Sequence, residues 1–423
     1  MRRLYSLILY FLTPLVLLRL AWRGLRAPDY WRRWPERFGF FPAPARSGAI
    51  WVHAVSVGEF QAALPLIKAL MARYPSAPLV VTTTTPTGSA RVKAALGDAV
   101  FHVYVPYDLP GAVSRFLDRI RPQVAMIMET ELWPNLFHGC RQRGIPVILA
   151  NARLSERSAA GYRRIAGLTR QTLACITVIA AQGEADAQRL ISLGADAARL
   201  RVTGNIKFDI ALPLDLDEQA DALRRDLGAT RPVWIAASTH EGEDEVILAA
   251  HALVRQRLPD ALLMLVPRHP ERFARVAQLA RKQGYGIVLR SERRPCDRAA
   301  AVFIGDSMGE LMLFYAAADA AFVGGSLIAS GGHNMLEPAA LGLPVITGPH
   351  TFNFAQIGQM LIEAGAARQV SDARELAEVV IDCLHDANLR LSMGEKGRQI
   401  VAQNRGALEG LVEMIAGHVP LLR

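Results

Sequence analysis

The sequence predicts an α/β protein made of two Rossmann-like halves, and two observations support this prediction. Short apolar runs alternate with helical stretches from residue 49 onward, and a second alternation follows residue 229. Such alternation is typical of parallel sheets covered by helices. The chain has 423 residues, whereas single domains usually have ~100–200. Two doubly wound halves joined by one linker predict a ligand cleft between them, at the carboxyl ends of both sets of strands.

The apolar runs predict where the strands lie. The first half is expected to have strands at Ala49–Val55, Leu79–Thr84, Val124–Met128 and Pro146–Ala150, with helices at about Phe60–Tyr74 and Thr87–Leu96. The second half is expected to have strands at Val233–Ala237, Ala261–Val266, Gly286–Leu289, Ala301–Ile304, Ala320–Val323 and Pro344–Thr347. These runs are short and continuous, as buried parallel strands usually are.

The same pattern predicts the domain boundaries. Residues 49–210 and 230–400 are assigned to the two Rossmann-like domains. Residues 211–229 are Asp-rich and then helical, and we assign them to the linker. Residues 401–423 are expected to form a C-terminal helix that packs back on the first domain. Residues 1–22 and 23–48 precede the first domain and are treated separately.

Most of the net charge of +9 lies in the first 46 residues. Nine arginines stand there against Asp29 and Glu36, a balance of nine minus two, or +7, which leaves +2 for the remaining 377 residues. These arginines lie beside the apolar segment Leu4–Leu18, where anionic lipid head groups would attract them. The position of the charge therefore argues against a nucleic-acid partner and for a membrane surface.

Residues 1–22 are predicted to be an uncleaved membrane anchor that leaves the body of the protein in the cytoplasm. The apolar segment is shorter than the ~20 residues that cross a bilayer, and Pro14 is expected to interrupt it. Arg19-Leu-Ala-Trp-Arg23 is a poor cleavage site for a signal peptide, and the arginines favour the cytoplasmic side. The alternative is a buried helix of the first domain. Residues 23–48, basic and aromatic, are expected to lie on the membrane surface; the alternative is a solvated linker.

The cysteines predict neither a disulfide framework nor a zinc site. They lie far apart and show no Cys-x-x-Cys spacing, which fits a reducing compartment; they are Cys140, Cys175, Cys296 and Cys383. No metal and no cofactor are expected.

Glu59 is the first candidate for catalysis. Ser56-Val-Gly-Glu59 lies where the first strand passes into a helix, at the edge of the predicted cleft. A carboxylate there can take a proton from an acceptor hydroxyl. Acidic residues are also common in first helical turns because they complement the helix dipole. The residue types alone leave both interpretations open.

Glu129 and Lys207 are the next candidates in the first half. Glu129 and Glu131 follow a predicted strand, where carboxylates are costly to bury without partners. Glu129 is favoured because it follows the strand directly; the alternative is helix capping ahead of Pro134. Lys207 lies just before the linker and is expected to face the cleft, although a single lysine is more commonly a solvated surface group.

Two segments of the second half suit a nucleotide. Pro267, Arg268 and His269 end a predicted strand, and the planar guanidinium of an arginine binds phosphate with paired hydrogen bonds. His269 by itself is more typical of a structural histidine. Met308-Gly309-Glu310 follows another strand and begins a helix, where backbone N–H groups are available to an anion or to the edge of a base.

A glycine-rich loop between residues 323 and 344 is the strongest of these features. Gly331-Gly-His-Asn334 leads into a helix that begins with Asn334, Met335, Leu336 and Glu337. Glycines let the backbone approach a phosphate, the helix end stabilises its charge, and a carboxylate accepts hydrogen bonds from ribose. The loop lacks the lysine of a P-loop. Because the glycines lie in the second half, the pattern argues against a nicotinamide dehydrogenase.

Together these segments closely resemble the Kdo transferases, which add 3-deoxy-D-manno-octulosonic acid (Kdo) to the lipid A precursor in lipopolysaccharide synthesis. The resemblance runs nearly end to end. It covers the amino-terminal anchor and the motifs Ser56-Val-Gly-Glu59, Thr85-Pro-Thr-Gly88, Met128-Glu-Thr-Glu-Leu-Trp-Pro-Asn135, Asn151-Ala-Arg-Leu-Ser155, Lys207-Phe-Asp209, Ser238-Thr-His-Glu-Gly242, Pro267-Arg-His-Pro270, Met308-Gly-Glu310 and Gly331-Gly-His-Asn334 with Glu337.

The resemblance implies a GT-B fold at the inner membrane and an inverting transfer of Kdo from CMP-Kdo to the tetra-acylated lipid A precursor, lipid IVA. It implies that Glu59 is the general base and that Glu129 and Lys207 stabilise the transition state. It also implies that CMP is held by three segments, Pro267–His269, Met308–Glu310 and Asn334–Glu337. The expected partners are therefore CMP-Kdo, the lipid A precursor and inner-membrane lipids.

Two other functions fit parts of the sequence. One is a GT-B relative that uses a UDP or ADP sugar, such as a heptosyltransferase or a nucleotide-sugar epimerase. The other is a non-catalytic membrane scaffold with a degenerate nucleotide fold, against which the intact Glu59, Lys207, Arg268 and Glu337 argue.

Overall fold

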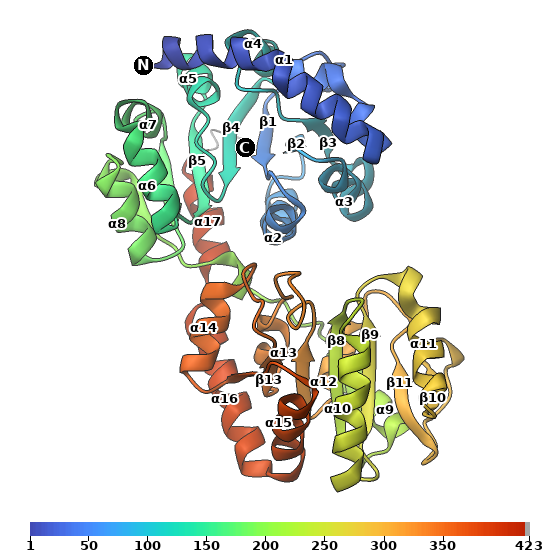
Figure 1. Cartoon of the computed structure of the whole chain (residues 1–423). Helices are drawn as coiled ribbons and strands as arrows, with labels where there is room; N and C mark the ends of the chain where they lie inside the picture. The colour runs from blue at the N-terminus through green and yellow to red at the C-terminus, as the bar shows by residue number, and fades with distance from the viewer. Residues whose placement is uncertain (419–423) are drawn as a thin grey trace. The chain divides into compact units, whose positions relative to one another are not determined.

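The computed structural model describes residues 1–418, which form two compact units. Unit 1 contains Met1–Asp209 and the C-terminal segment from Arg405, and unit 2 contains Ile210–Asn404. Each unit is built on one seven-stranded sheet with helices on both faces (Figure 1). The predicted α/β architecture of two Rossmann-like halves is confirmed.

The sheet of unit 1 has the order β3-β2-β1-β4-β5-β6-β7, with all neighbours parallel. The order reverses between β1 and β4, and ligands of doubly wound folds bind outside the carboxyl ends of the strands at such a reversal. The strands are β1 (Ala49–His53), β2 (Leu79–Thr83), β3 (Phe101–Tyr104), β4 (Pro122–Met128), β5 (Val147–Ala152), β6 (Val178–Ala181) and β7 (Leu200–Val202).

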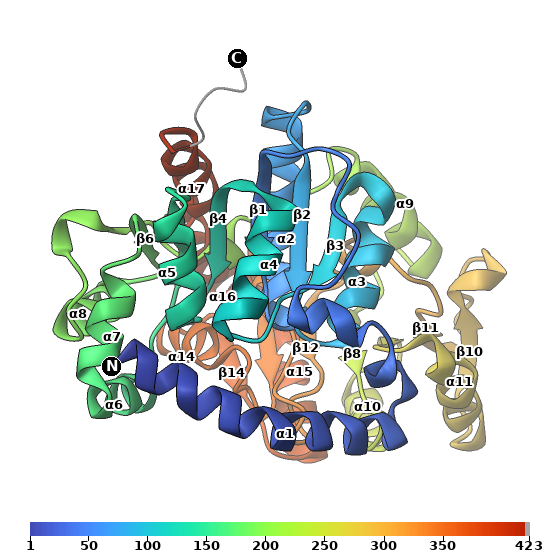
Figure 2. The ribbon, with the colours of Figure 1, turned by 90° about the horizontal axis from the view of Figure 1, so that it is seen from above.

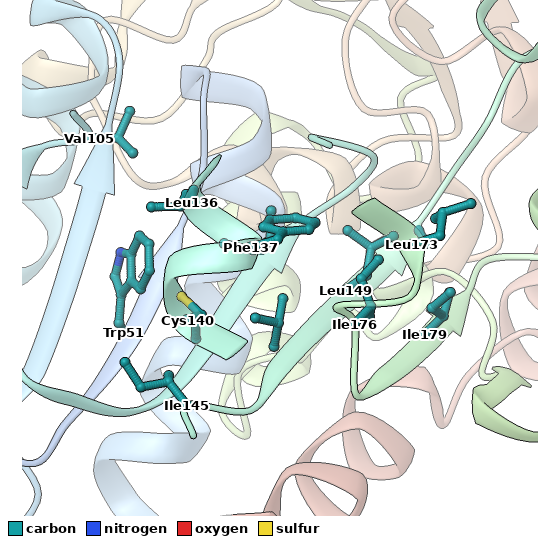
Figure 3. Packing of buried hydrophobic residues seen from close by; sticks show 14 of the residues in the cluster. Trp51, Val105, Leu136, Phe137, Cys140, Ile145, Leu149, Leu173, Ile176 and Ile179 are labelled. Carbon is teal, nitrogen blue, oxygen red and sulfur yellow. The ribbon is translucent and has the colours of Figure 1, made fainter. Parts of the chain in front are cut away.

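Both faces of this sheet are buried because successive residues of each strand point to opposite sides. On β1, Trp51 belongs to the core under α4, α5 and α7, which Figure 3 shows from close by, and Ile50 belongs to the core under α2 and α17. The helices are α2 (Val57–Arg73), α3 (Pro86–Leu96), α4 (Pro110–Ile120), α5 (Pro134–Gln142), α6 (Glu156–Arg164), α7 (Ala166–Leu173), α8 (Glu184–Ser192) and α17 (Ala407–Ala416).

The C-terminal helix α17 packs against α2 of unit 1 through Leu411 and Ile415, both fully buried. Asp209 fixes its first turn, because its carboxylate accepts hydrogen bonds from the N–H groups of Gly406 and Leu408, both at 2.7 Å. A carboxylate at the start of a helix satisfies N–H groups that lack helical partners. The last five residues of the predicted C-terminal helix, 419–423, lie outside the described residues.

Unit 2 contains a second parallel sheet in the order β10-β11-β9-β8-β12-β13-β14. Its order reverses between β8 and β12. The strands are β8 (Val233–Thr239), β9 (Leu262–Pro267), β10 (Gly286–Leu289), β11 (Ala300–Ile304), β12 (Ala320–Val323), β13 (Val345–Thr347) and β14 (Ala367–Gln369). The helices are α9 (Leu216–Leu227), α10 (Asp244–Arg257), α11 (Phe273–Lys282), α12 (Leu311–Ala316), α13 (Leu336–Ala340), α14 (Ala355–Glu363), α15 (Ala373–His385) and α16 (Ala387–Gln403).

The chain between the units is shorter than the assigned linker. Residues 209–215 contain no helix or strand. From Leu216 the chain forms α9, which packs on the second sheet through Leu216, Leu223 and Leu227. The helical part of residues 211–229 therefore belongs to unit 2.

Helix α1 (Arg2–Arg26) contradicts the predicted interruption at Pro14, which lies inside the helix. Among residues 1–418, α1 is the one helix long and apolar enough to cross a membrane, by length and composition. It begins beside α7 (Figure 2), and its first turns are joined to α5. Asn135 Oδ1 accepts hydrogen bonds from Arg2 Nη1 and Ser6 Oγ, each at 3.0 Å.

Most of α1 is exposed, contrary to the alternative of a buried helix. Leu4, Leu7, Phe11, Leu15 and Leu18 are between 53% and 75% exposed. Because these positions follow one another by three or four residues, they form one apolar stripe along the helix.

The basic segment 23–48 is not entirely available to a membrane. Arg37 is 5% exposed, donates a hydrogen bond to the carbonyl of Thr84 at 2.8 Å and lies over the ring of Tyr104. Arg33 pairs with Glu36 at 2.6 Å and donates to the carbonyl of His102 at 3.0 Å. These two arginines attach the segment to unit 1, which corrects the expectation that the whole segment lies on a membrane surface or is a solvated linker.

Candidate active site

Glu59 lies in the first turn of α2, directly after β1. Ser56 caps this helix, and its Oγ accepts a hydrogen bond from the N–H of Glu59 at 3.2 Å. The Glu59 carboxylate in turn accepts hydrogen bonds from Ser56 Oγ at 3.1 Å and from the N–H of Val55 at 2.8 Å. This arrangement resembles a capping box. Glu59 therefore lies in a first helical turn, as the alternative interpretation expected, and it also takes part in capping the helix.

Glu59 also has the electrostatics of a general base. Burial raises its pKa to about 7, and the nearby charges of Glu129 and Glu131 act in the same direction, whereas the hydrogen bonds from Val55 and Ser56 oppose them. A base is most effective when its pKa lies near the working pH. The capping contacts hold this carboxylate in place, so the two roles are compatible.

Glu129 lies at the end of β4 and interacts with two cations. Its carboxylate oxygens lie 3.8 Å from Lys207 Nζ and 3.6 Å from a guanidinium nitrogen of Arg153. Its φ of 53° is in the left-handed region, which is strained for a residue other than glycine and is common at functional sites. The predicted catalytic residues Glu59, Glu129 and Lys207 therefore lie in one electrostatic cluster, at the carboxyl edge of the first sheet.

Lys207 is held by a short 3-10 helix, η5 (Ile206–Phe208), which Asn205 caps. The side chain of Lys207 is 20% exposed. Burial lowers its pKa, while the charges of Glu129 and Glu59 oppose that shift. Lys207 is therefore a partly buried member of the cluster rather than a solvated surface lysine.

No role was predicted for Arg153 from the sequence, although Arg153 belongs to one of the motifs shared with the Kdo transferases. Arg153 follows the end of β5, the neighbour of β4 in the sheet. Asn151, at the end of β5, is fully buried with a φ of 54°, and its Oδ1 accepts a hydrogen bond from the N–H of Ile206 at 3.2 Å. The signal that favoured Glu129, a polar residue directly after a buried strand, applies equally to these two residues.

Unit 2 brings several of the predicted CMP-binding residues together at the carboxyl edge of its sheet. Arg268 follows β9, and its charge acts on both Glu337 and His333. Asn334 links to Glu337 through a hydrogen bond from Nδ2 to Oε1 at 3.1 Å. Burial raises the pKa of Glu337, whereas the Asn334 hydrogen bond and the Arg268 charge oppose that rise.

Three histidines lie beside Arg268. The rings of His240 and His333 stack with centroids 5.0 Å apart, their Nε2 atoms are 2.8 Å apart, and His269 meets His240 edge-on at 5.5 Å. Because one Nε2 must donate and the other accept, at least one of the stacked rings is neutral. Burial lowers the pKa of both, to about 3 for His333, with the charge of Arg268 acting in the same direction.

The other predicted CMP-binding residues differ in how far their side chains are exposed. Pro267, Met335 and Leu336 are buried, so their side chains belong to the core. Met308 is 55% exposed and Gly309 has a φ of 87°. Glu310 forms a bidentate salt bridge with Arg290, in which Nε and Nη2 of Arg290 donate to the two carboxylate oxygens. These hydrogen bonds lower the pKa of Glu310. Met308, Gly309 and Glu310 follow β11, next to β9 in the sheet, so they lie at the same edge as Arg268.

Among residues 1–418 no group of three or more His, Cys, Asp or Glu side chains is arranged to hold a metal ion. The sequence does contain one Asp-x-Asp, the arrangement that often holds a metal-bound diphosphate. It is Asp215-Leu-Asp217, at the start of α9, and both of its carboxylates are exposed.

The fold and the two sites define a glycosyltransferase of the GT-B class. Residues 232–400 match the family model described as "Glycosyl transferases group 1". The fold is shared with UDP-GlcNAc 2-epimerase from Neisseria meningitidis bound to UDP-GlcNAc, at 14% identity and a TM-score of 0.57, over 87% of this chain and 100% of that one.

The particular family follows from the first unit and from the whole-chain relatives. Residues 32–210 match the model of the 3-deoxy-D-manno-octulosonic-acid transferases. The chain is 44% identical to the 3-deoxy-D-manno-octulosonic acid transferase of Haemophilus influenzae, over 98% of each chain, and 39% identical to that of Bordetella pertussis, over 96% of each.

The chain belongs to the 3-deoxy-D-manno-octulosonic acid (Kdo) transferase family, and the resemblance inferred from the motifs is confirmed. It is therefore a glycosyltransferase that transfers Kdo in lipopolysaccharide synthesis. This assignment removes the two alternatives, an enzyme for UDP or ADP sugars and a non-catalytic scaffold.

The cluster in unit 1 predicts how Glu59 responds to its neighbours. Replacement of Lys207 by Met removes a positive charge near Glu59, so the pKa of Glu59 should rise further above about 7. Carboxyl NMR titration of glutamate-labelled protein measures this shift, with Glu59→Gln used to assign the signal. The control is Lys68→Met, which changes an exposed lysine of α2, the helix that contains Glu59, and should leave the titration of Glu59 unchanged. An unchanged Glu59 titration in Lys207→Met would contradict the coupling.

Proposed function

We propose that the chain transfers Kdo from CMP-Kdo to a glucosamine hydroxyl of lipid IVA, the tetra-acylated lipid A precursor, with Glu59 as the general base. The observation that carries this proposal is the Glu59 carboxylate, which is held by Ser56 and Val55 and has a pKa near 7. At neutral pH about half of such a group is ionised and able to accept a proton.

The proposed chemistry is a single displacement. The acceptor hydroxyl gives its proton to Glu59, its oxygen bonds to the anomeric carbon of Kdo, and the bond from that carbon to the phosphate oxygen breaks, so that CMP leaves. Positive charge develops at the anomeric centre and negative charge on the departing phosphate, and preorganised charges of opposite sign stabilise each of them. We assign this role to Glu129 and Lys207, whose side chains are 16% and 20% exposed and hold each other's orientation.

Unit 2 supplies groups that suit a nucleotide with one phosphate. Arg268 offers a planar pair of donors for the phosphate. At the start of α13, Asn334 offers an amide donor and Glu337 offers a carboxylate acceptor. We assign the CMP moiety to the segments Pro267–His269, Met308–Glu310 and Asn334–Glu337, with Met335 and Leu336 contributing only their backbone because their side chains are fully buried.

We propose that α1 anchors the enzyme to the inner membrane, with both units on the cytoplasmic side. The exposed apolar stripe of α1 and the arginines Arg3, Arg19, Arg23 and Arg26 of the same helix support this. Apolar side chains enter the bilayer, while arginines contact anionic head groups. A membrane-bound enzyme meets a lipid acceptor in the bilayer where that acceptor resides.

Glu59→Gln tests the base directly. The amide keeps the size of the side chain but cannot take a proton, so Kdo transfer should fall by at least ~100-fold, the low end of general-base contributions. Mass spectrometry of lipid IVA incubated with CMP-Kdo and enzyme measures donor use, acceptor use and the number of additions together. The wild-type kcat/KM should fall about tenfold per pH unit below pH 7, because Glu59 becomes protonated there. Near-normal turnover of Glu59→Gln would remove Glu59 from the mechanism.

Arg268→Ala and Glu337→Ala test the donor assignment. Loss of a charged hydrogen bond to phosphate or ribose should weaken CMP binding by about tenfold or more. Isothermal titration with CMP measures this effect. Arg275→Ala is the control, since Arg275 is 65% exposed and pairs with Glu241 on the surface. CMP affinity equal to that of wild type in both variants would contradict the assignment.

Replacement of Phe11 and Leu15 by Glu tests the anchor without disturbing the core, because these side chains are 75% and 61% exposed. Flotation with vesicles that contain phosphatidylglycerol should show most of the wild type bound and most of the variant free, because buried charges are costly in the bilayer. Leu391→Glu is the control, as Leu391 is an exposed leucine of unit 2. Equal flotation of all three proteins would rule out α1 as the anchor.

A further inference from the structure

Glu243 makes an unusual set of contacts in unit 2. It is fully buried, and its carboxylate accepts four hydrogen bonds from backbone N–H groups. One oxygen accepts from His240 at 2.9 Å and Gly325 at 2.7 Å. The other accepts from Ser326 and Leu327, both at 3.0 Å. All four bonds have normal N–H···O lengths.

Three of these N–H groups, those of Gly325, Ser326 and Leu327, belong to the loop that follows β12, the first part of the glycine-rich segment. The glycines of this segment were expected from the sequence to bring the backbone close to a phosphate. At Gly325–Leu327 that expectation is wrong, because Glu243 already occupies the three N–H groups. Consecutive N–H groups form a nest that binds an anion, and here the anion is a side chain of the protein itself.

This contact lies where the strand order of the second sheet reverses, the position at which doubly wound folds bind ligands. Glu243 and His240 follow β8, and the other three partners follow β12; the reversal lies between these two strands. The carboxylate therefore fixes the two loops of the reversal to each other. Next to it, Ser238 at the end of β8 has a φ of 56°.

Two further contacts connect Glu243 to the proposed donor site. The N–H of Gly332 donates to the carbonyl of Gly325 at 2.7 Å, so the second part of the glycine-rich loop rests on the first. His333 Nε2 lies 2.8 Å from His240 Nε2. Glu243 thus holds the backbone of both His240 and Gly325, and through them it sets the position of His333 and of Asn334, which follows it.

We propose that Glu243 is a positioning residue for the donor site, an inference that rests on the proposed function of unit 2. Its carboxylate fixes the glycine-rich loop so that His333 and Asn334 stand beside Arg268 when the nucleotide phosphate binds. A buried carboxylate is costly unless its oxygens are satisfied, and four N–H donors meet that requirement. The same four donors lose their partner when the carboxylate is lost.

Glu243→Gln is the variant that tests the proposal. Its amide group has the size of the carboxylate but presents an NH₂ to two of the four N–H groups. We expect CMP affinity to fall about tenfold or more, since unsatisfied buried donors are costly. We also expect KM for CMP-Kdo to rise by a similar factor, while kcat stays within about threefold because Glu59, Glu129 and Lys207 are untouched. Glu245→Gln, an exposed residue of the same helix, is the control and should behave as wild type.

Hydrogen exchange separates positioning from general destabilisation. In Glu243→Gln the amides of Ser326 and Leu327 should exchange faster, while those of β8 and β9 remain protected. Faster exchange with unchanged CMP affinity would overturn the proposal and leave the proposed function intact, as would a fall in kcat with unchanged KM. Exchange of the loop amides at the wild-type rate would also overturn it. A wild-type protein without CMP affinity would instead overturn the proposed function, and the donor role of Glu243 with it.

Discussion

The constraint on which the site depends is the burial of carboxylates at the carboxyl ends of parallel strands. In unit 1 three carboxylates, Glu59, Glu129 and Glu131, face two cations, Lys207 and Arg153. One carboxylate therefore lacks a compensating charge, and burial raises the pKa of Glu59 to about 7.

Because the pKa of Glu59 lies above the usual value of 4.5, the folded state holds the proton more tightly than the unfolded chain. The stability that Glu59 contributes is complete below pH 4.5 and is lost as the pH rises through 7. The residue that weakens the fold at neutral pH is the one able to accept a proton there.

In unit 2 the buried carboxylate of Glu243 has a different set of hydrogen-bond partners from the carboxylate of Glu59. The Glu243 carboxylate accepts hydrogen bonds from four backbone N–H groups, two at each oxygen. Glu59 accepts two hydrogen bonds, one from the N–H of Val55 and one from Ser56 Oγ, and burial raises its pKa to about 7. The same topological position, the start of the helix that follows the first strand of each sheet, thus carries a carboxyl group with a raised pKa in unit 1 and a carboxylate held by four N–H donors in unit 2.

The strands and site residues could be predicted from the sequence to an extent that depended on how deeply each element is buried. The central strands were placed to within two residues because they are continuous apolar runs, and β10 and β12 were placed at their observed bounds. The strands β3, β6, β7 and β14 were missed; polar residues interrupt the apolar pattern in β3, β7 and β14, such as Arg201 in β7. The candidates Glu59, Glu129 and Lys207 were found by their place after strands or before the linker. Arg153 was not, although it follows the end of β5 as Glu129 follows β4. Glu243 was not, because its role depends on contacts with residues 82 or more positions away, which no local pattern records.

Backbone strain supplies a signal for the site that the sequence does not contain. Three of the six non-glycine residues with positive φ among residues 1–418 are Glu129, Asn151 and Ser238, and each lies at the carboxyl end of a central strand, β4, β5 or β8. A non-glycine residue in this region costs roughly 1–3 kcal/mol and persists only where its surroundings fix it. Hydrogen bonds fix all three regions, through the N–H of Glu129 to the carbonyl of Ala150, through Asn151 Oδ1 to Ile206, and through the loops that Glu243 joins. The left-handed backbone interrupts the alternating pattern of the strand at these positions, and at Glu129 it places a carboxylate beside Lys207 and Arg153.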